Sequence, residues 1–273
     1  MQHVIKNNRK SKNLLEKLNN FQPVNSDVTP LRILLHGPVG AGKSSFINSV
    51  DSCLEGRVTT RALTSSILEG GSFTLECKTF KFKKTDSFYP FTLIDICGLE
   101  DKKGIQTQDI IKLLNGHIRN YYTFNSVKAI SEEDPKYNKN PSLKDKIHCL
   151  VSVLSANSIS RMEEKKDVIR KMKEVRRIAS NLGIPQAIIM TKVDEACPLV
   201  KANLEKVYTS KKIKEKMELC SSTLGVPVSY IFPIKNYHEE HTTNNTADFL
   251  ILDALQRIVN FADDYVKDQV DND

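Results

Sequence analysis

Residues 37–44 have the sequence GPVGAGKS, which fits the phosphate-binding pattern G-x-x-x-x-G-K-[ST] at every fixed position. The glycines let backbone N–H groups curl around phosphate oxygens, and a following helix adds positive potential at its first turn. In this pattern Lys43 reaches the β and γ phosphates and the Ser44 hydroxyl binds Mg2+. We therefore predict a nucleoside triphosphate site formed by Gly37, Pro38, Val39, Gly40, Ala41, Gly42, Lys43, Ser44 and Ser45.

A second short motif, DICG at 95–98, follows the apolar run FTLI. A carboxylate at the end of such a strand can hold the magnesium ion through water, and the glycine N–H can donate to the γ phosphate. We expect these roles for Asp95 and Gly98, because the motif comes in the right order after the phosphate loop.

A third motif, TKVD at 191–194, indicates which base is bound. The Asp194 carboxylate can accept hydrogen bonds from N1–H and the 2-amino group of guanine, whereas N1 of adenine is an acceptor that a carboxylate repels. The methylene stem of Lys192 can lie along the base. We also expect Lys235 and Asn236, in PIKNY at 233–237, to lie at the base edge. The predicted ligands are GTP or GDP with Mg2+, and Thr191 completes the base motif.

The elements that position these motifs can be predicted from hydrophobic periodicity. Continuous apolar runs, which are typical of strands covered on both faces, occupy 31–36, 91–96, 147–156, 185–191 and 226–234. Segments with helical spacing alternate with them, and the alternating stretch 72–82 predicts an edge hairpin with 91–96. The pattern predicts an α/β fold with a doubly wound, mostly parallel sheet and helices on both faces.

Composition favours one main domain. The chain has 273 residues, 27% of them charged, and a net charge of +7 that does not discriminate between partners. We expect an N-terminal helical extension over residues 1–30, a nucleotide-binding domain over 31–268 with an insertion loop around 121–146, and a flexible tail over 269–273. With no apolar run long enough for a signal peptide or a membrane span, a cytoplasmic protein is expected.

The three motifs together resemble the translation-factor-like class of P-loop GTPases, and the chain is more closely similar to the interferon-induced protein 44 family. This second resemblance extends to GRVTTRAL, NPSLKDKIHC and ILDALQRIVNFADDYVKD, which carry no nucleotide chemistry. It implies a guanine-nucleotide-binding fold and a cytoplasmic, interferon-induced protein with a role in antiviral innate immunity. We expect no counterpart here of the TLDc domain that some members carry at their N-terminus.

Three departures from the GTPase pattern bear on activity. Thr191 stands where an asparagine commonly braces the phosphate loop, and it keeps one hydroxyl for that purpose. Leu99 stands where a signalling GTPase has the glutamine that orients water, and Val39 fills the space that an arginine finger would use. The sequence therefore names no catalytic residue and predicts slow hydrolysis at most. The magnesium-binding threonine of the first switch is expected to be Thr64 or Thr60.

Three functions remain open at this stage. The first is a slow GTPase or GTP-dependent switch, with unidentified protein partners and a nucleotide-dependent homodimer as an open arrangement. The second is a nucleotide-independent or GDP-locked scaffold that retains the fold. The third is an ATP-handling enzyme, against which Asp194 argues. The basic stretches 161–177 and 201–216 lack interleaved aromatic residues, which favours solvated helix faces over a nucleic-acid or membrane surface.

Overall fold

The apolar runs form the strands of one six-stranded sheet in the computed structural model, which describes residues 2–62, 76–99, 105–160 and 166–271. The strand order is β2-β3-β1-β4-β5-β6. β2 runs antiparallel to β3, and the other neighbouring pairs are parallel. The strands are β1 (Leu31–His36), β2 (Lys78–Lys83), β3 (Phe88–Asp95), β4 (Cys149–Ser155), β5 (Gln186–Thr191) and β6 (Ile231–Pro233).

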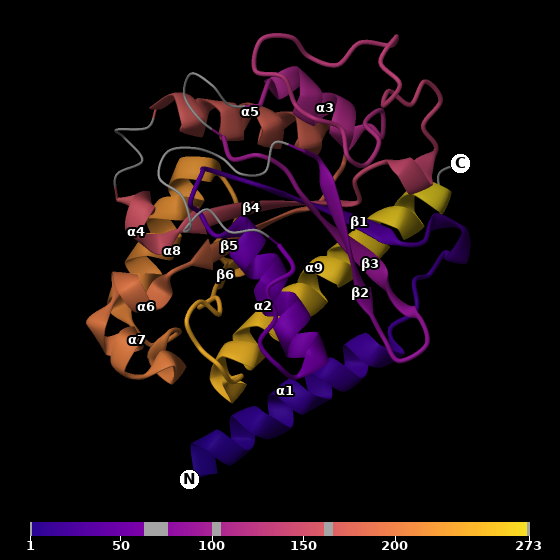
Figure 1. Ribbon diagram of the computed structural model, residues 1–273. Helices are drawn as coiled ribbons and strands as arrows, with labels where there is room; N and C mark the ends of the chain where they lie inside the picture. Colours follow the sequence, from indigo (N-terminus) through magenta and orange to yellow (C-terminus); the bar gives the residue numbers. More distant parts are fainter. Residues whose placement is uncertain (1, 63–75, 100–104, 161–165, 272–273) are drawn as a thin grey trace.

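Helices form a layer on either side of this sheet (Figure 1). α9 contacts β1, β4 and α2 in one layer, whereas α5 contacts β4, β5, α3 and α8 in the other. The helices are α1 (Gln2–Asn20), α2 (Lys43–Glu55), α3 (Thr107–Leu114), α4 (Ala156–Ile159), α5 (Lys166–Asn181), α6 (Val193–Ala196), α7 (Pro198–Ala202), α8 (Lys211–Leu224) and α9 (Asn245–Asp271). The prediction of a doubly wound, mostly parallel α/β fold of the P-loop GTPase type is confirmed.

The strand predictions are right for most of the sheet. The hairpin expected from 72–82 is confirmed for β2, while residues 72–75 lie outside the described part of the chain. The run at 226–234 was expected to be one long strand, and this prediction is wrong for its first half. Pro227 has no N–H to donate to a ladder, and residues Val228–Tyr230 form a 3-10 turn before the short β6 begins.

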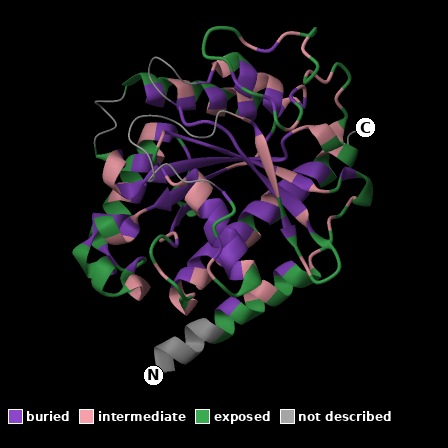
Figure 2. Cartoon of the chain, viewed as in Figure 1, coloured by how far each residue is buried: buried purple, intermediate pink, exposed green. Residues whose placement is uncertain are grey.

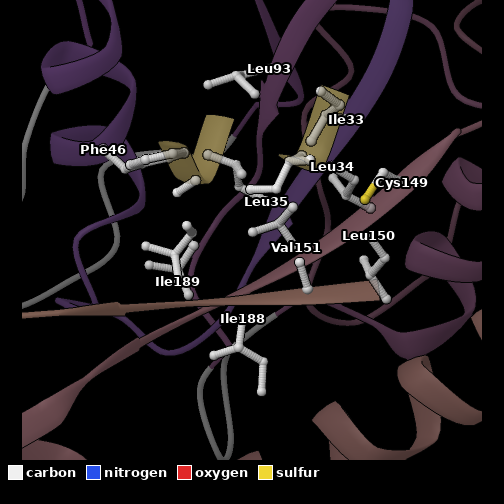
Figure 3. Close-up of a cluster of buried hydrophobic side chains, with 14 of the residues drawn as sticks. Ile33, Leu34, Leu35, Phe46, Leu93, Cys149, Leu150, Val151, Ile188 and Ile189 are labelled. Atoms are coloured by element: carbon white, nitrogen blue, oxygen red, sulfur yellow. The ribbon is translucent and has the colours of Figure 1, made fainter. Parts of the chain in front are cut away.

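The core lies between the sheet and its helices, where every strand except the edge strand β2 is buried along most of its length (Figure 2). Figure 3 shows side chains from four neighbouring strands in one buried cluster with Phe46 of α2, among them Ile33, Leu93, Val151 and Ile189. All of these side chains are fully or almost fully buried. Burial of each one stabilises the fold by about 1.5–3 kcal/mol, which fixes the sheet edge where the phosphate loop begins.

The segments outside the sheet are held by specific contacts. α1 packs along α9, with Leu18 fully buried. The 121–146 segment is tied to α3, since the Asp109 carboxylate accepts a hydrogen bond from the Ile130 N–H at 2.8 Å. α9 continues to Asp271, so residues 269–271 are helical. The division into an extension, a domain with an insertion and a tail stays a prediction.

None of the helices in the described part of the chain is both long enough and apolar enough to cross a bilayer.

Candidate functional site

The loop between β1 and α2 has the shape that its glycines predict. Gly37, Gly40 and Gly42 have φ values of 149°, 73° and 96°. At Gly37 a Cβ would lie 2.2 Å from the Val153 carbonyl oxygen, so only glycine allows the loop to pass this close to β4. At Gly40 no heavy atom lies within 4 Å of an added Cβ, so the space beside the loop is open.

Lys43 folds over this loop. Its Nζ donates to the carbonyl oxygens of Gly37 and Pro38 at 3.2 and 3.3 Å. The residue is only 7% exposed, and burial lowers the pKa of its ammonium group although the nearby Asp95 carboxylate opposes this shift. The ammonium group is thus held above the loop without a direct carboxylate partner among the described residues, where a phosphate would be its strongest ligand.

Ser44 and Asp95 meet across the sheet edge. The Ser44 hydroxyl, in the first turn of α2, donates to Asp95 Oδ2 at 2.6 Å, and Asp95 ends β3. Hydroxyl and carboxylate oxygens are ligands that Mg2+ accepts. In the described parts of the chain, no three His, Cys, Asp or Glu side chains are grouped to hold a metal ion, so phosphate and water oxygens would have to complete the coordination.

The residues after Asp95 are joined to the phosphate loop. Leu99 N–H donates to the Gly37 carbonyl oxygen at 2.9 Å, and Pro38 and Leu99 form an isolated parallel bridge. Gly98 lies against Val39, because an added Cβ would be 2.7 Å from the Val39 backbone nitrogen. The Leu99 side chain is 2% exposed and belongs to the hydrophobic core. The DICG segment and the phosphate loop therefore form one continuous wall.

The end of β5 reaches the same loop from the other side. Thr191 Oγ1 donates to the Ala41 carbonyl oxygen at 2.6 Å. Asn236, which follows β6, donates from Nδ2 to the Gly42 carbonyl oxygen at 3.2 Å. Sequence reasoning placed Asn236 only at the base edge; the structure also brings it to the phosphate loop, across a separation of 194 residues.

A single cavity of about 370 Å³ joins the phosphate loop to the TKVD motif. Its size is in the range of small-molecule sites. The residues that line it are Gly40, Gly42, Ser45, Lys192, Asp194, Glu195, Lys235, Asn236, Tyr237, His238, Glu239 and Glu240.

Both lysines that line this cavity, Lys192 and Lys235, form ion pairs with glutamates. Lys235 lies 2.7 Å from Glu240, and Lys192 lies 3.8 Å from Glu195. Burial raises the pKa of Glu240, but hydrogen bonds from Lys235 and the His238 backbone outweigh it and lower the pKa to about 2. Among the described residues, Asp194 has no protein hydrogen-bond or ion-pair partner and is left to accept hydrogen bonds from a ligand.

Several residues of the cavity wall were not predicted from the sequence. Glu240 and Glu195 belong to short polar stretches that look like solvated loops, and in the structure ion pairs and hydrogen bonds hold them in the wall. Tyr237 is held there by its backbone N–H, which donates to Ser49 Oγ at 2.9 Å, and by its phenol, which donates to Asp248 Oδ1 at 2.7 Å. The one sequence feature that could have pointed to Tyr237 is its position directly after PIKN.

The segment expected to carry the switch threonine packs against α2. Thr59 is 8% exposed and its N–H donates to Ser52 Oγ at 2.9 Å. The Asn48 amide makes hydrogen bonds with both the N–H and the carbonyl of Ala62, at 2.7 and 2.9 Å. Thr60 is exposed, and Thr64 lies outside the described residues. The choice between Thr60 and Thr64 therefore stays a prediction.

Comparison with known proteins finds relatives that extend beyond this chain. Human (Homo sapiens) interferon-induced protein 44 is 37% identical over 258 residues, covering 94% of this chain and 58% of that protein. The mouse (Mus musculus) protein of the same name is 34% identical, with coverages of 94% and 60%. Human interferon-induced protein 44-like is 34% identical, with coverages of 98% and 59%. The chain thus spans less than two thirds of the length of these relatives. No protein-family model matches it.

Solved structures resemble the chain more distantly. A probable GTP-binding protein engB is 15% identical, with a TM-score of 0.43 and coverages of 75% of this chain and 88% of that one. Translation elongation factor SelB from Methanococcus maripaludis, in complex with the GTP analogue GppNHp, is 13% identical, with a TM-score of 0.41 and coverages of 86% and 34%. Scores this low add nothing to the fold assignment, which rests on the strand order and the loop.

Proposed function

The chain belongs, over the region that it shares with these relatives, to the interferon-induced protein 44 family, and from this premise we propose that it is a guanine-nucleotide-binding protein. The observation that carries the proposal is the single cavity whose wall includes both the phosphate loop and Asp194. A nucleotide is a ligand with a polyanionic end and a hydrogen-bonding base, and the two ends of this cavity match those two parts.

The phosphate end fits a triphosphate with its magnesium ion. The Gly40 side of the loop is open, and Lys43 is already held over it. Ser44 Oγ and Asp95 would hold Mg2+, Asp95 through water, and Thr64 or Thr60 of the first switch would add a further oxygen. When bound, Mg2+ neutralises charge on the β and γ phosphates. The Gly98 N–H would donate to the γ phosphate from the segment that lies against Val39.

The base end fits guanine. Asp194 would accept from N1–H and the 2-amino group, Lys192 would lie along the ring, and Lys235 and Asn236 would border the base edge. Adenine would place its N1 acceptor against the Asp194 carboxylate.

Hydrolysis by the isolated protein would be slow. Leu99 is buried and its backbone is hydrogen-bonded to Gly37, so it cannot align water. The function that we propose is a slow GTPase or GTP-dependent switch that acts in the cytoplasm in interferon-induced antiviral innate immunity, together with protein partners. The family resemblance and the names of these relatives support this biological setting.

One observation favours a second function, a GDP-locked or nucleotide-independent scaffold. Residues 59–62 pack on α2 and residues 98–99 pack on the phosphate loop. A switch requires such segments to rearrange with the γ phosphate, whereas a scaffold keeps them in place.

Nucleotide content and binding of the purified protein test the proposal. We expect GDP or GTP to be released on denaturation, and micromolar binding of Mg·GTP and Mg·GDP but not Mg·ATP. Lys43→Ala should weaken the affinity for these nucleotides by at least about tenfold, because a charge-assisted contact contributes about 1.5–3 kcal/mol. Lys211→Ala, on the exposed start of α8, is the matched control. Empty wild-type protein that binds none of the three nucleotides would leave the scaffold as the function.

A further inference from the structure

The phosphate loop turns two neighbouring carbonyl oxygens toward the ends of β5 and β6. Thr191 Oγ1 donates to the Ala41 carbonyl at 2.6 Å, and Asn236 Nδ2 donates to the Gly42 carbonyl at 3.2 Å. Thr191 and Asn236 thus each donate a hydrogen bond to one of two adjacent backbone carbonyls. A threonine hydroxyl has one proton to donate, so Thr191 cannot serve both, whereas one asparagine amide has two N–H donors.

The two side chains also share the same space. A Cβ added at Gly42 would lie 3.0 Å from Asn236 Nδ2 and 3.3 Å from Thr191 Cγ2. Gly42 is the N-cap of α2 with φ 96°, and the peptide groups that follow it are those that face a bound phosphate. The backbone N–H of the next residue, Tyr237, is tied to Ser49 of the same helix. The 236–237 segment is therefore attached directly to the N-cap and to the middle of α2.

From these contacts we infer that Asn236 is a positioning residue for the phosphate loop, and that Asn236 and Thr191 together do what one asparagine at position 191 would do alone. The inference rests on the proposed nucleotide site and deepens it. Asn236 acts through Gly42 on the direction of the loop N–H groups, so its effect belongs to the phosphate end of the ligand. Through this hydrogen bond, the loop that borders the base also becomes a part of the phosphate-binding structure.

The size of the effect follows from the partners of the Gly42 carbonyl. That oxygen also accepts the Phe46 N–H at 2.8 Å, so it keeps a helical partner when the Asn236 amide is removed. The loss is one neutral hydrogen bond and not an orphaned carbonyl. We expect Asn236→Ala to weaken nucleotide binding by about three- to tenfold. Asn236→Asp, of nearly equal size, should weaken it more, because a carboxylate oxygen would face the carbonyl.

Rescue by a second substitution separates this role from a general structural one. Thr191→Asn alone should crowd Gly42. In the Asn236→Ala background, however, the new amide can occupy the vacated space and donate hydrogen bonds to the carbonyl oxygens of both Ala41 and Gly42. The double variant should return to within about twofold of wild type, since the number of donors is restored. Asn260→Ala, an exposed amide on α9, is the control.

The measurements are affinities for Mg·GDP, Mg·GTP and Mg·tripolyphosphate, with amide hydrogen exchange of residues 42–46 in the nucleotide-free protein. We expect Asn236→Ala to weaken all three ligands by a similar factor and to speed exchange, and Thr191→Asn to reverse both effects. An Asn236→Ala loss confined to GDP and GTP, or a double variant worse than either single variant, would overturn the inference. If wild-type protein bound no nucleotide, the proposed function would fail, and unchanged exchange in Asn236→Ala would separately refute the positioning role.

Discussion

Substitution of Asp194 by asparagine should exchange the base preference of the site from guanine to xanthine. Guanine presents N1–H and a 2-amino donor, and a carboxylate accepts from both. Xanthine carries a carbonyl in place of the 2-amino group. The amide of the substituted asparagine would donate to that carbonyl from its nitrogen while its oxygen still accepts from N1–H.

The environment of Asp194 sets the magnitude. The nearby lysines are engaged by other carboxylates, Lys192 by Glu195 at 3.8 Å and Lys235 by Glu240 at 2.7 Å, so the base edge is the partner left for Asp194. Two charge-assisted hydrogen bonds would contribute about 3–6 kcal/mol if fully desolvated. Asp194 is half-buried, and competing water reduces this to about 2–3 kcal/mol. The expected loss of GTP affinity is about 30- to 150-fold.

Competition of GTP and XTP against a fluorescent GDP analogue measures the change. Glu218→Gln is the matched control, because it removes the same charge from a side chain of α8 that is 53% exposed, pairs with Lys214 and does not line the cavity. We expect that control to change GTP affinity less than about threefold. An unchanged GTP:XTP preference in Asp194→Asn, with binding still dependent on Lys43, would show that TKVD does not read the base.

Three further predictions concern turnover and stability. Single-turnover GTP hydrolysis by the monomer should be well below about one per minute, and a fast burst would contradict the role given to Leu99. Gly98→Ala should lower the urea-measured free energy of unfolding by about 1–3 kcal/mol, because its Cβ would lie 2.7 Å from the Val39 backbone; an unchanged midpoint would mean that the wall is not rigid. His148 should contribute up to about 1.4 kcal/mol per pH unit to a fall in unfolding free energy between about pH 6.5 and 4, because burial lowers its pKa to about 4 and only the unfolded chain takes up this proton in that range. His148→Asn should reduce that slope, since its amide keeps an acceptor for the Arg32 N–H without titrating, and an equal slope in both proteins would exclude His148 as the cause.

The parts of the site that follow strands directly could be predicted from the sequence. Asp95 and Thr191 come at the carboxyl ends of β3 and β5, and the phosphate loop follows β1. In a parallel sheet these ends share one edge, so three motifs in the right order suffice to bring them together. The fold class was accessible for the same reason, because buried parallel strands read as continuous apolar runs.

The parts of the site that depend on the path of a loop could not be predicted. The contact between Asn236 and Gly42 joins residues 194 positions apart, and no local pattern encodes which end of the amide meets the carbonyl. The same is true of Thr59, whose N–H donates to Ser52 Oγ of α2. Loop paths are set by such individual side-chain hydrogen bonds, which periodicity does not report.

The hydrogen bonds of Tyr237 extend this reasoning from the cavity to the C-terminal helix. Its phenol donates to Asp248 Oδ1 at 2.7 Å in the first turn of α9, and Cys53 of α2 donates to the same oxygen at 3.1 Å. α1 in turn packs along α9. A displacement of Tyr237 on nucleotide binding would therefore either move the start of α9 or break the Tyr237–Asp248 hydrogen bond.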